Sequence, residues 1–138
     1  MDPTNPFPPA EFLRDGEDDL VEAARELLGF DTTNPPGRTR EAVDWLEARF
    51  GDLGLSTERY AVDPAKPNLL ATLPGAGERT LCLAGHVDTV PFDADEWSHD
   101  PLGERDGDRL YGRGATDMKG AVAAMLAVAR AYVETGTT

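Results

Sequence analysis

Two clusters of side chains in this sequence could do chemistry, and the first surrounds a histidine. An apolar run, Leu81–Ala84, leads into Gly85-His86-Val87-Asp88. If the chain stays extended, His86 and Asp88 lie on one face, because alternate side chains of a strand share a face. A carboxylate behind a metal-binding histidine accepts its other N–H and fixes its tautomer. A structural pair at a strand end fits the same pattern, so His-x-Asp needs support from elsewhere.

The second cluster is the glycine-rich segment 111–120, which contains Asp117. Asp117 stands where a helix is expected to begin, so one interpretation makes it an N-cap. The spacing excludes a phosphate loop, because a third glycine would have to replace Asp117 and no Ser or Thr follows Lys119. A carboxylate there would also repel phosphate. Metal binding is the better interpretation of this aspartate.

Helices and a loop must position these clusters. Apolar residues at three- and four-residue spacing predict a helix from Asp18 to a stop at Gly29. The same pattern predicts helices from about Thr39 to Leu53 and from Met118 to about Val133. Residues 31–37 contain two adjacent prolines and must form a stiff loop. We expect residues 1–16 to be an extended, partly disordered lead-in, and residues 17–138 to belong to one domain.

Buried strands complete the predicted fold. Candidates are 55–62, 68–73 and 80–86, and the last is apolar on both faces, as a central strand covered by helices should be. Asp106-Gly107 predicts a hairpin turn. The expected class is α/β, a three-layer sandwich with a mostly parallel central sheet. Ligands of such sheets collect at the carboxyl ends of strands, where His86 stands. Cys82, the only cysteine, is expected to be a small buried apolar side chain.

Composition narrows the partners. The chain has 138 residues, with 26 acidic against 13 basic side chains and a formal net charge of −13. That field repels nucleic acids and anionic lipids, so neither is an expected partner. There is no long apolar run and no secretory signal pattern, which favours a cytoplasmic location. Scattered acidity with only two lysines, Lys66 and Lys119, is typical of salt-loving archaea; an ordinary acidic cytosolic protein is the alternative.

Several motifs in order resemble one family, that of acetylornithine deacetylase, succinyl-diaminopimelate desuccinylase, aminoacylase and glutamate carboxypeptidase. They are residues 33–37, 85–91, Trp97, Asp100-Pro101 and 110–120, and the resemblance covers about residues 18–134. It implies the N-terminal portion of a zinc-peptidase catalytic domain. The implied reaction is hydrolysis of an amide bond in an N-acyl amino acid or small peptide by a two-zinc site, with cobalt as another usable metal.

The resemblance also implies roles for single residues. His86 corresponds to a terminal ligand of one zinc, and Asp117 to the carboxylate that bridges both, followed by a cis peptide bond. Asp88 corresponds to the catalytic carboxylate that orients His86. His99 matches no ligand position and is expected to be a loop residue. The family's Glu-Glu pair, further acid and distant histidine match nothing in this chain, so we expect the 138 residues alone to be inactive and to bind zinc weakly.

Two other functions stay open from the sequence. The first is a catalytically inactive truncated domain that keeps the fold for binding or assembly. The second is a mononuclear or non-zinc hydrolase in which His86 and Asp88 act in another way. In the longer protein that the resemblance implies, a lid domain would mediate homodimerisation.

Overall fold

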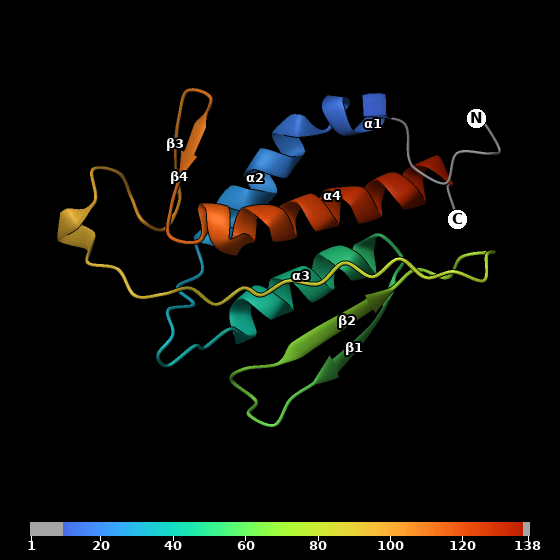
Figure 1. Ribbon diagram of the computed structural model, residues 1–138, viewed down its shortest axis with the longest axis horizontal. Helices are drawn as coiled ribbons and strands as arrows, with labels where there is room; N and C mark the ends of the chain where they lie inside the picture. The colour runs from blue at the N-terminus through green and yellow to red at the C-terminus, as the bar shows by residue number, and fades with distance from the viewer. Residues whose placement is uncertain (1–9, 137–138) are drawn as a thin grey trace.

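A computed structural model describes residues 10–136 of the chain (Figure 1). The elements follow the order α1 (Ala10–Asp15), α2 (Glu17–Leu28), α3 (Arg40–Asp52), β1 (Ser56–Tyr60), β2 (Asn68–Thr72), a 3-10 turn (Ala94–Glu96), β3 (Glu104–Asp106), β4 (Arg109–Tyr111), a kinked turn (Ala115–Lys119) and α4 (Gly120–Thr135). The predicted helices, the first two strands and the hairpin are confirmed within a few residues. Their signals are local, which is why the sequence revealed them.

Helices α2 and α3 end and begin where the sequence predicts. Three acidic residues occupy the first turn of α2, where they suit the positive end of the helix dipole, and Gly29 follows its last residue. The side chains of α2 and α3 are joined through one carboxylate: Glu26 Oε2 accepts from Trp45 Nε1 at 2.7 Å and from an Arg49 nitrogen at 2.8 Å. This contact links the two helices.

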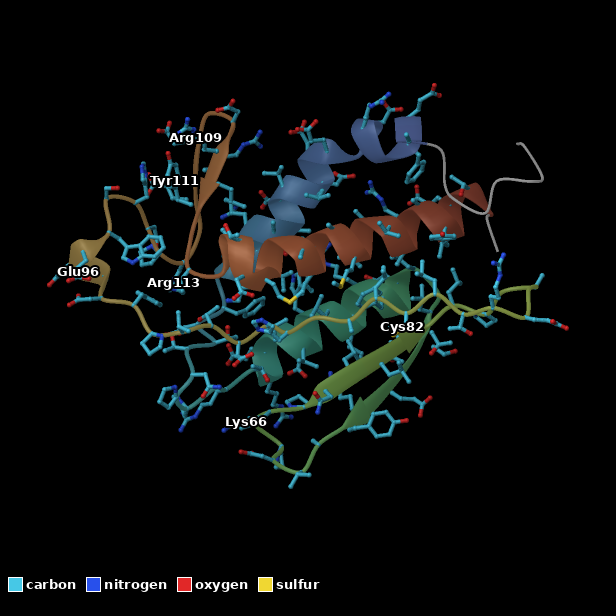
Figure 2. All side chains as sticks on the ribbon, in the orientation of Figure 1. Lys66, Cys82, Glu96, Arg109, Tyr111 and Arg113 are labelled. Atoms are coloured by element: carbon cyan, nitrogen blue, oxygen red, sulfur yellow. The ribbon has the colours of Figure 1, made fainter. Side chains whose placement is uncertain are left out.

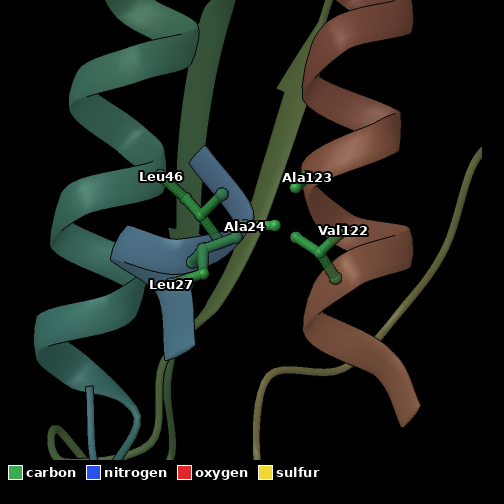
Figure 3. Packing of buried hydrophobic residues seen from close by; sticks show 5 residues of the cluster. All are labelled: Ala24, Leu27, Leu46, Val122 and Ala123. Carbon is green, nitrogen blue, oxygen red and sulfur yellow. The ribbon is translucent and has the colours of Figure 1, made fainter. Parts of the chain in front are cut away.

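The hydrophobic core lies between the three long helices. It contains Ala24 and Leu27 of α2, Leu46 of α3, and Val122 and Ala123 of α4, all buried (Figure 3). Small alanines on α2 and α4 let these helices approach closely. Because the glycine-rich segment leads directly into α4, packing of α4 in this core also positions that segment.

Two antiparallel hairpins flank the helices. β1 pairs with β2, with Ser56 opposite Thr72 and Tyr60 opposite Asn68, and this hairpin lies beside α3 (Figure 1). Arg59 of β1 forms ion pairs with Asp44 and Glu47 of α3. β3 pairs with β4 around the predicted Asp106-Gly107 turn.

The predicted central strand over 80–86 is wrong as a paired strand. The segment runs extended between the helices (Figure 1), but in the described part of the chain residues 80–86 pair with no strand. An isolated parallel bridge between Thr33 and Thr89 follows just after them. Leu81 and Leu83 are 61% and 49% exposed. The prediction that Cys82 is buried is also wrong, since Cys82 is exposed (Figure 2). A strand needs neighbours along its edges, and none of the described residues supplies them.

The mixed α/β class is confirmed, although the sheets among the described residues are antiparallel pairs and no parallel central sheet forms there. The extended lead-in is wrong for residues 10–15, which form α1; residues 1–9 lie outside the described part. No helix between residues 10 and 136 is long and apolar enough to cross a membrane.

Candidate metal centre

The two predicted clusters meet at His86. Its Nε2 lies 3.1 Å from Asp117 Oδ1, across 31 residues of sequence. Its Nδ1 lies 3.0 Å from the backbone oxygen of Asp88 and 3.1 Å from the carboxylate oxygen Oδ1 of the same residue. Each ring nitrogen therefore faces a different aspartate. The structure brings together all three residues that the sequence singled out.

Asp117 lies in the kinked turn before α4 and has extended, non-helical backbone angles. Helix α4 begins at Gly120 and no side chain caps its N-terminus, so the N-cap interpretation of Asp117 is excluded. The Asp117 carboxylate is 85% exposed and faces His86. The peptide bond between Asp117 and Met118 is cis, as the family resemblance implies.

The pKa shifts of His86 and Asp88 favour an ionised carboxylate beside a basic imidazole. Partial burial lowers the pKa of His86, but hydrogen bonds to Asp88 and Asp117 outweigh it, so the pKa lies above its ordinary value. A hydrogen bond from Asn34 is the largest cause that holds the pKa of Asp88 below its usual range. Asp88 is therefore a charged acceptor for the Nδ1–H of His86.

The loop after α2 supports the segment that carries His86 and Asp88, although no sequence pattern assigns a role to any single residue of this loop. Thr32 is buried, and its Oγ1 donates to the carbonyl oxygen of Val87 at 2.6 Å. The Thr89 N–H donates to the Thr32 oxygen at 3.1 Å, and the Asn34 N–H donates to the Thr89 oxygen at 2.8 Å. No local sequence pattern predicts that Thr32 is buried; the prolines that follow predict only that the loop is stiff.

The burial of Lys119 is also not expected from the sequence. It is 1% exposed, and its Nζ donates to the carbonyl oxygen of Phe30 at 2.6 Å. Burial lowers its pKa to about 8, with Asp31 opposing the change. Lysines are almost never fully buried, so the sequence predicts an exposed side chain here. Only the structure shows that Lys119 joins the turn before α4 to the loop after α2.

The three residues line a cleft of about 420 Å³, together with Asn34, Trp97 and Arg113 among others. The Arg113 guanidinium lies 5.3 Å from the centre of the Trp97 ring, a cation–π contact between two residues that line the cleft. Gly114 also lines the cleft with a left-handed φ of +93°, and a Cβ there would lie 2.7 Å from Thr89 Cγ2. Glycine at this position lets the two clusters approach each other.

His99 is a loop residue, as predicted. Its ring stacks on Tyr111 at 3.7 Å between centroids, and its Nδ1 lies 3.1 Å from Glu104 Oε1. It is not among the residues that line the cleft.

Metal-ligand chemistry is present in part. Imidazole nitrogen and carboxylate oxygen are the donors that zinc takes, and Asp88 stands where an outer carboxylate orients a ligating histidine. In the described part of the chain, however, no group of three or more His, Cys, Asp or Glu side chains converges as a complete site. The donor types present are ones that a metal takes.

The chain is similar to several known proteins. Residues 82–138 match the family described as Peptidase family M20/M25/M40. A succinyl-diaminopimelate desuccinylase of Methylocella silvestris is 41% identical over 121 residues, 84% of this chain and 31% of that enzyme. An acetylornithine deacetylase of Vibrio campbellii is 50% identical over 82 residues, 58% of this chain and 21% of the enzyme.

A deformylase of Bacillus subtilis, which acts on N-formyl-4-amino-5-aminomethyl-2-methylpyrimidine, is 36% identical over 121 residues and 83% of this chain. The crystal structure of human carnosine dipeptidase 1 matches with a TM-score of 0.77 and 26% identity, over 95% of this chain and 33% of that one. Sequence and fold together define the class of this chain. It belongs to peptidase family M20/M25/M40, and it spans 28% of the deformylase and 31% of the desuccinylase.

Proposed function

We propose that this chain supplies part of a metal site for amide-bond hydrolysis, with His86 and Asp117 as ligands and Asp88 as the residue that orients His86. The observation that carries the proposal is the position of the imidazole, with Nδ1 at Asp88 and Nε2 at Asp117. The names of the relatives, a deacetylase, a desuccinylase, a deformylase and a dipeptidase, share hydrolysis of an amide bond.

The chain's own residues have distinct tasks in this proposal. Asp88 keeps a proton on Nδ1, so the lone pair of Nε2 is free to bind the metal. Asp117 would bind the metal through a carboxylate oxygen, and the exposure of its side chain would leave room for a second metal. Trp97 and Arg113 wall the cleft in which the substrate would lie. When bound, zinc or cobalt supplies Lewis-acid polarisation of the scissile carbonyl and activates water.

The substrate class proposed is an N-acyl amino acid or small peptide. The supporting observation is that the named relatives remove acetyl, succinyl or formyl groups, or cleave a dipeptide. A cytoplasmic location and homodimerisation of the longer protein through a lid domain belong to the same proposal. A general base and the remaining ligands would come from outside the 138 residues.

A zinc titration of the purified chain tests the ligand assignment, with His99→Ala as the matched control because the chain has only two histidines. We expect weak binding by the wild type, none by His86→Ala, and unchanged binding by His99→Ala. Equal loss in both variants would contradict the assignment. Tight binding of two zincs, or amidase activity abolished by His86→Ala, would contradict the view that the chain holds half a site.

The alternative is a catalytically inactive domain that keeps the fold alone. In that case wild type and His86→Ala would both fail to bind zinc while unfolding at the same temperature. The same titration therefore separates the two functions.

A further inference from the structure

One polar contact beside the proposed centre comes from Asn34, to which the proposed function gives no role. Its Nδ2 donates to Asp88 Oδ2 at 2.9 Å. The other oxygen of that carboxylate, Oδ1, lies 3.1 Å from His86 Nδ1. The two oxygens therefore have different partners on opposite sides. Because a carboxylate held at one oxygen still turns about its Cβ–Cγ bond, the Asn34 amide sets how Asp88 faces the imidazole.

Asn34 is itself held in place by the loop. Its N–H donates to the Thr89 oxygen at 2.8 Å, and Thr33 and Thr89 form the parallel bridge. Gly37 closes the turn with a hydrogen bond of 2.8 Å to the Thr33 oxygen. Gly37 has a left-handed φ of +73°, and a Cβ on it would meet the Asn34 side chain at 3.0–3.3 Å. The amide thus packs against a turn that only glycine allows.

The chemistry of the contact explains why an amide is required. The ionised Asp88 carboxylate only accepts hydrogen bonds, and Asn34 offers N–H donors. The Nδ1–H of His86 also reaches the backbone oxygen of Asp88 at 3.0 Å. That carbonyl holds the tautomer by itself, but only the carboxylate adds negative charge behind the ring. Asn34 therefore controls the charge that supports Nε2.

We propose that Asn34 is a positioning residue that acts through Asp88 and thereby strengthens metal binding by His86. The inference deepens the proposed function and rests on it for the identity of the ligands. Asn34 is an exposed residue and water competes for its partner, so the effect of losing one such hydrogen bond is about 3- to 10-fold in affinity. Loss of Asp88 itself is expected to cost ~10–100-fold.

Titration of the full chain with Co²⁺ alone, followed by visible absorption, tests this through a double-mutant cycle. We expect Asn34→Ala to weaken Co²⁺ binding and change the absorption of the bound ion, and to have no further effect when Asp88→Ala is already present. Asn34→Asp keeps the shape packed on Gly37 and should weaken binding at least as much. Asn68→Ala, on β2 and away from the cleft, is the control. Additive losses from Asn34→Ala and Asp88→Ala would overturn the inference.

Crystal structures of the metal-free wild type and Asn34→Ala provide a second readout. We expect the Asp88 carboxylate to turn away from His86 only in the variant; an unchanged Asp88 overturns the inference. If the wild type binds no Co²⁺, the ligand assignment fails, and these structures still decide whether Asn34 positions Asp88. If the wild type binds Co²⁺ and Asn34→Ala binds it equally, the assignment stands and the role of Asn34 fails.

Discussion

The ammonium nitrogen of Lys119 donates a hydrogen bond of 2.6 Å to the carbonyl oxygen of Phe30, across 89 residues of sequence. This contact ties the turn that carries Asp117 to the loop that carries Thr32 and Asn34. Lys119, Thr32 and Thr89 are the buried polar residues of the described chain. All three lie around this junction, so buried hydrogen bonds help to join the two halves of the site.

Lys119→Ala should lower the free energy of unfolding strongly. The variant loses a buried four-carbon stem, which for core side chains of similar length costs ~2–5 kcal/mol. Lys119→Met keeps most of the volume and loses the donor, at about 1–3 kcal/mol. Urea unfolding followed by circular dichroism measures both. Lys66→Ala, the exposed lysine labelled in Figure 2, is the control and should change little; equal effects at both lysines would contradict the role of Lys119.

Three glycine-to-alanine variants separate backbone strain from crowding. Gly51 lies in α3 with open space around it, so alanine there should stabilise by about 0.5–1 kcal/mol. Gly54 has φ +85° and open space, and should lose ~1–2 kcal/mol. Gly114→Ala adds the 2.7 Å clash with Thr89 and should lose ~1–3 kcal/mol more. If thermal unfolding shows Gly114→Ala to be no worse than Gly54→Ala, the clash is relieved by movement.

Features that depend on residues close together in the sequence could be predicted, and features that depend on contacts between distant residues could not. Helices α2 and α3 depend on apolar spacing within a dozen residues, and the β3–β4 turn on Asp106-Gly107, so these predictions are confirmed. Pairing of residues 80–86 depends on neighbours that no local pattern reveals. The His86–Asp117 contact could be predicted only because the motifs that contain these two residues resemble one family. The Asn34–Asp88 bond joins residues 54 apart, and although both lie in motifs of that family, the resemblance implies no role for Asn34.

Cys82 tests the corrected description of the predicted central strand. Because its side chain is exposed, a thiol reagent such as a maleimide should label it in the native protein nearly as fast as in urea. Mass spectrometry of timed samples measures both rates. Protection by several orders of magnitude in the native protein, with full labelling in urea, would show that residues 80–86 are covered after all.

Glu104 should make stability fall in acid. The Asp100 N–H and then His99 lower its pKa in the folded state, while the unfolded value is about 4.3. The unfolded chain therefore binds more protons between these two values, so this contribution is present above about pH 4.3 and is lost as the pH falls through the folded pKa. Glu104→Gln cannot ionise and should show a shallower fall of the unfolding temperature there than the wild type. Identical curves for both proteins would contradict this, and Glu134→Gln, at an exposed position of α4, is the control.

The net charge of −13 predicts that salt stabilises the fold. Repulsion among scattered carboxylates opposes the compact state, and the screening length falls from about 10 Å at ~0.1 M salt to ~3 Å at ~1 M. We expect the unfolding temperature to rise across this range of KCl, and to continue rising above ~1 M if the acidic surface is a halophilic adaptation. A variant with amides at the exposed residues Glu41, Asp52 and Glu134 should need less KCl to reach the same temperature. A rise that stops near ~0.3 M would favour an ordinary acidic cytosolic protein, because most long-range repulsion is screened at that concentration.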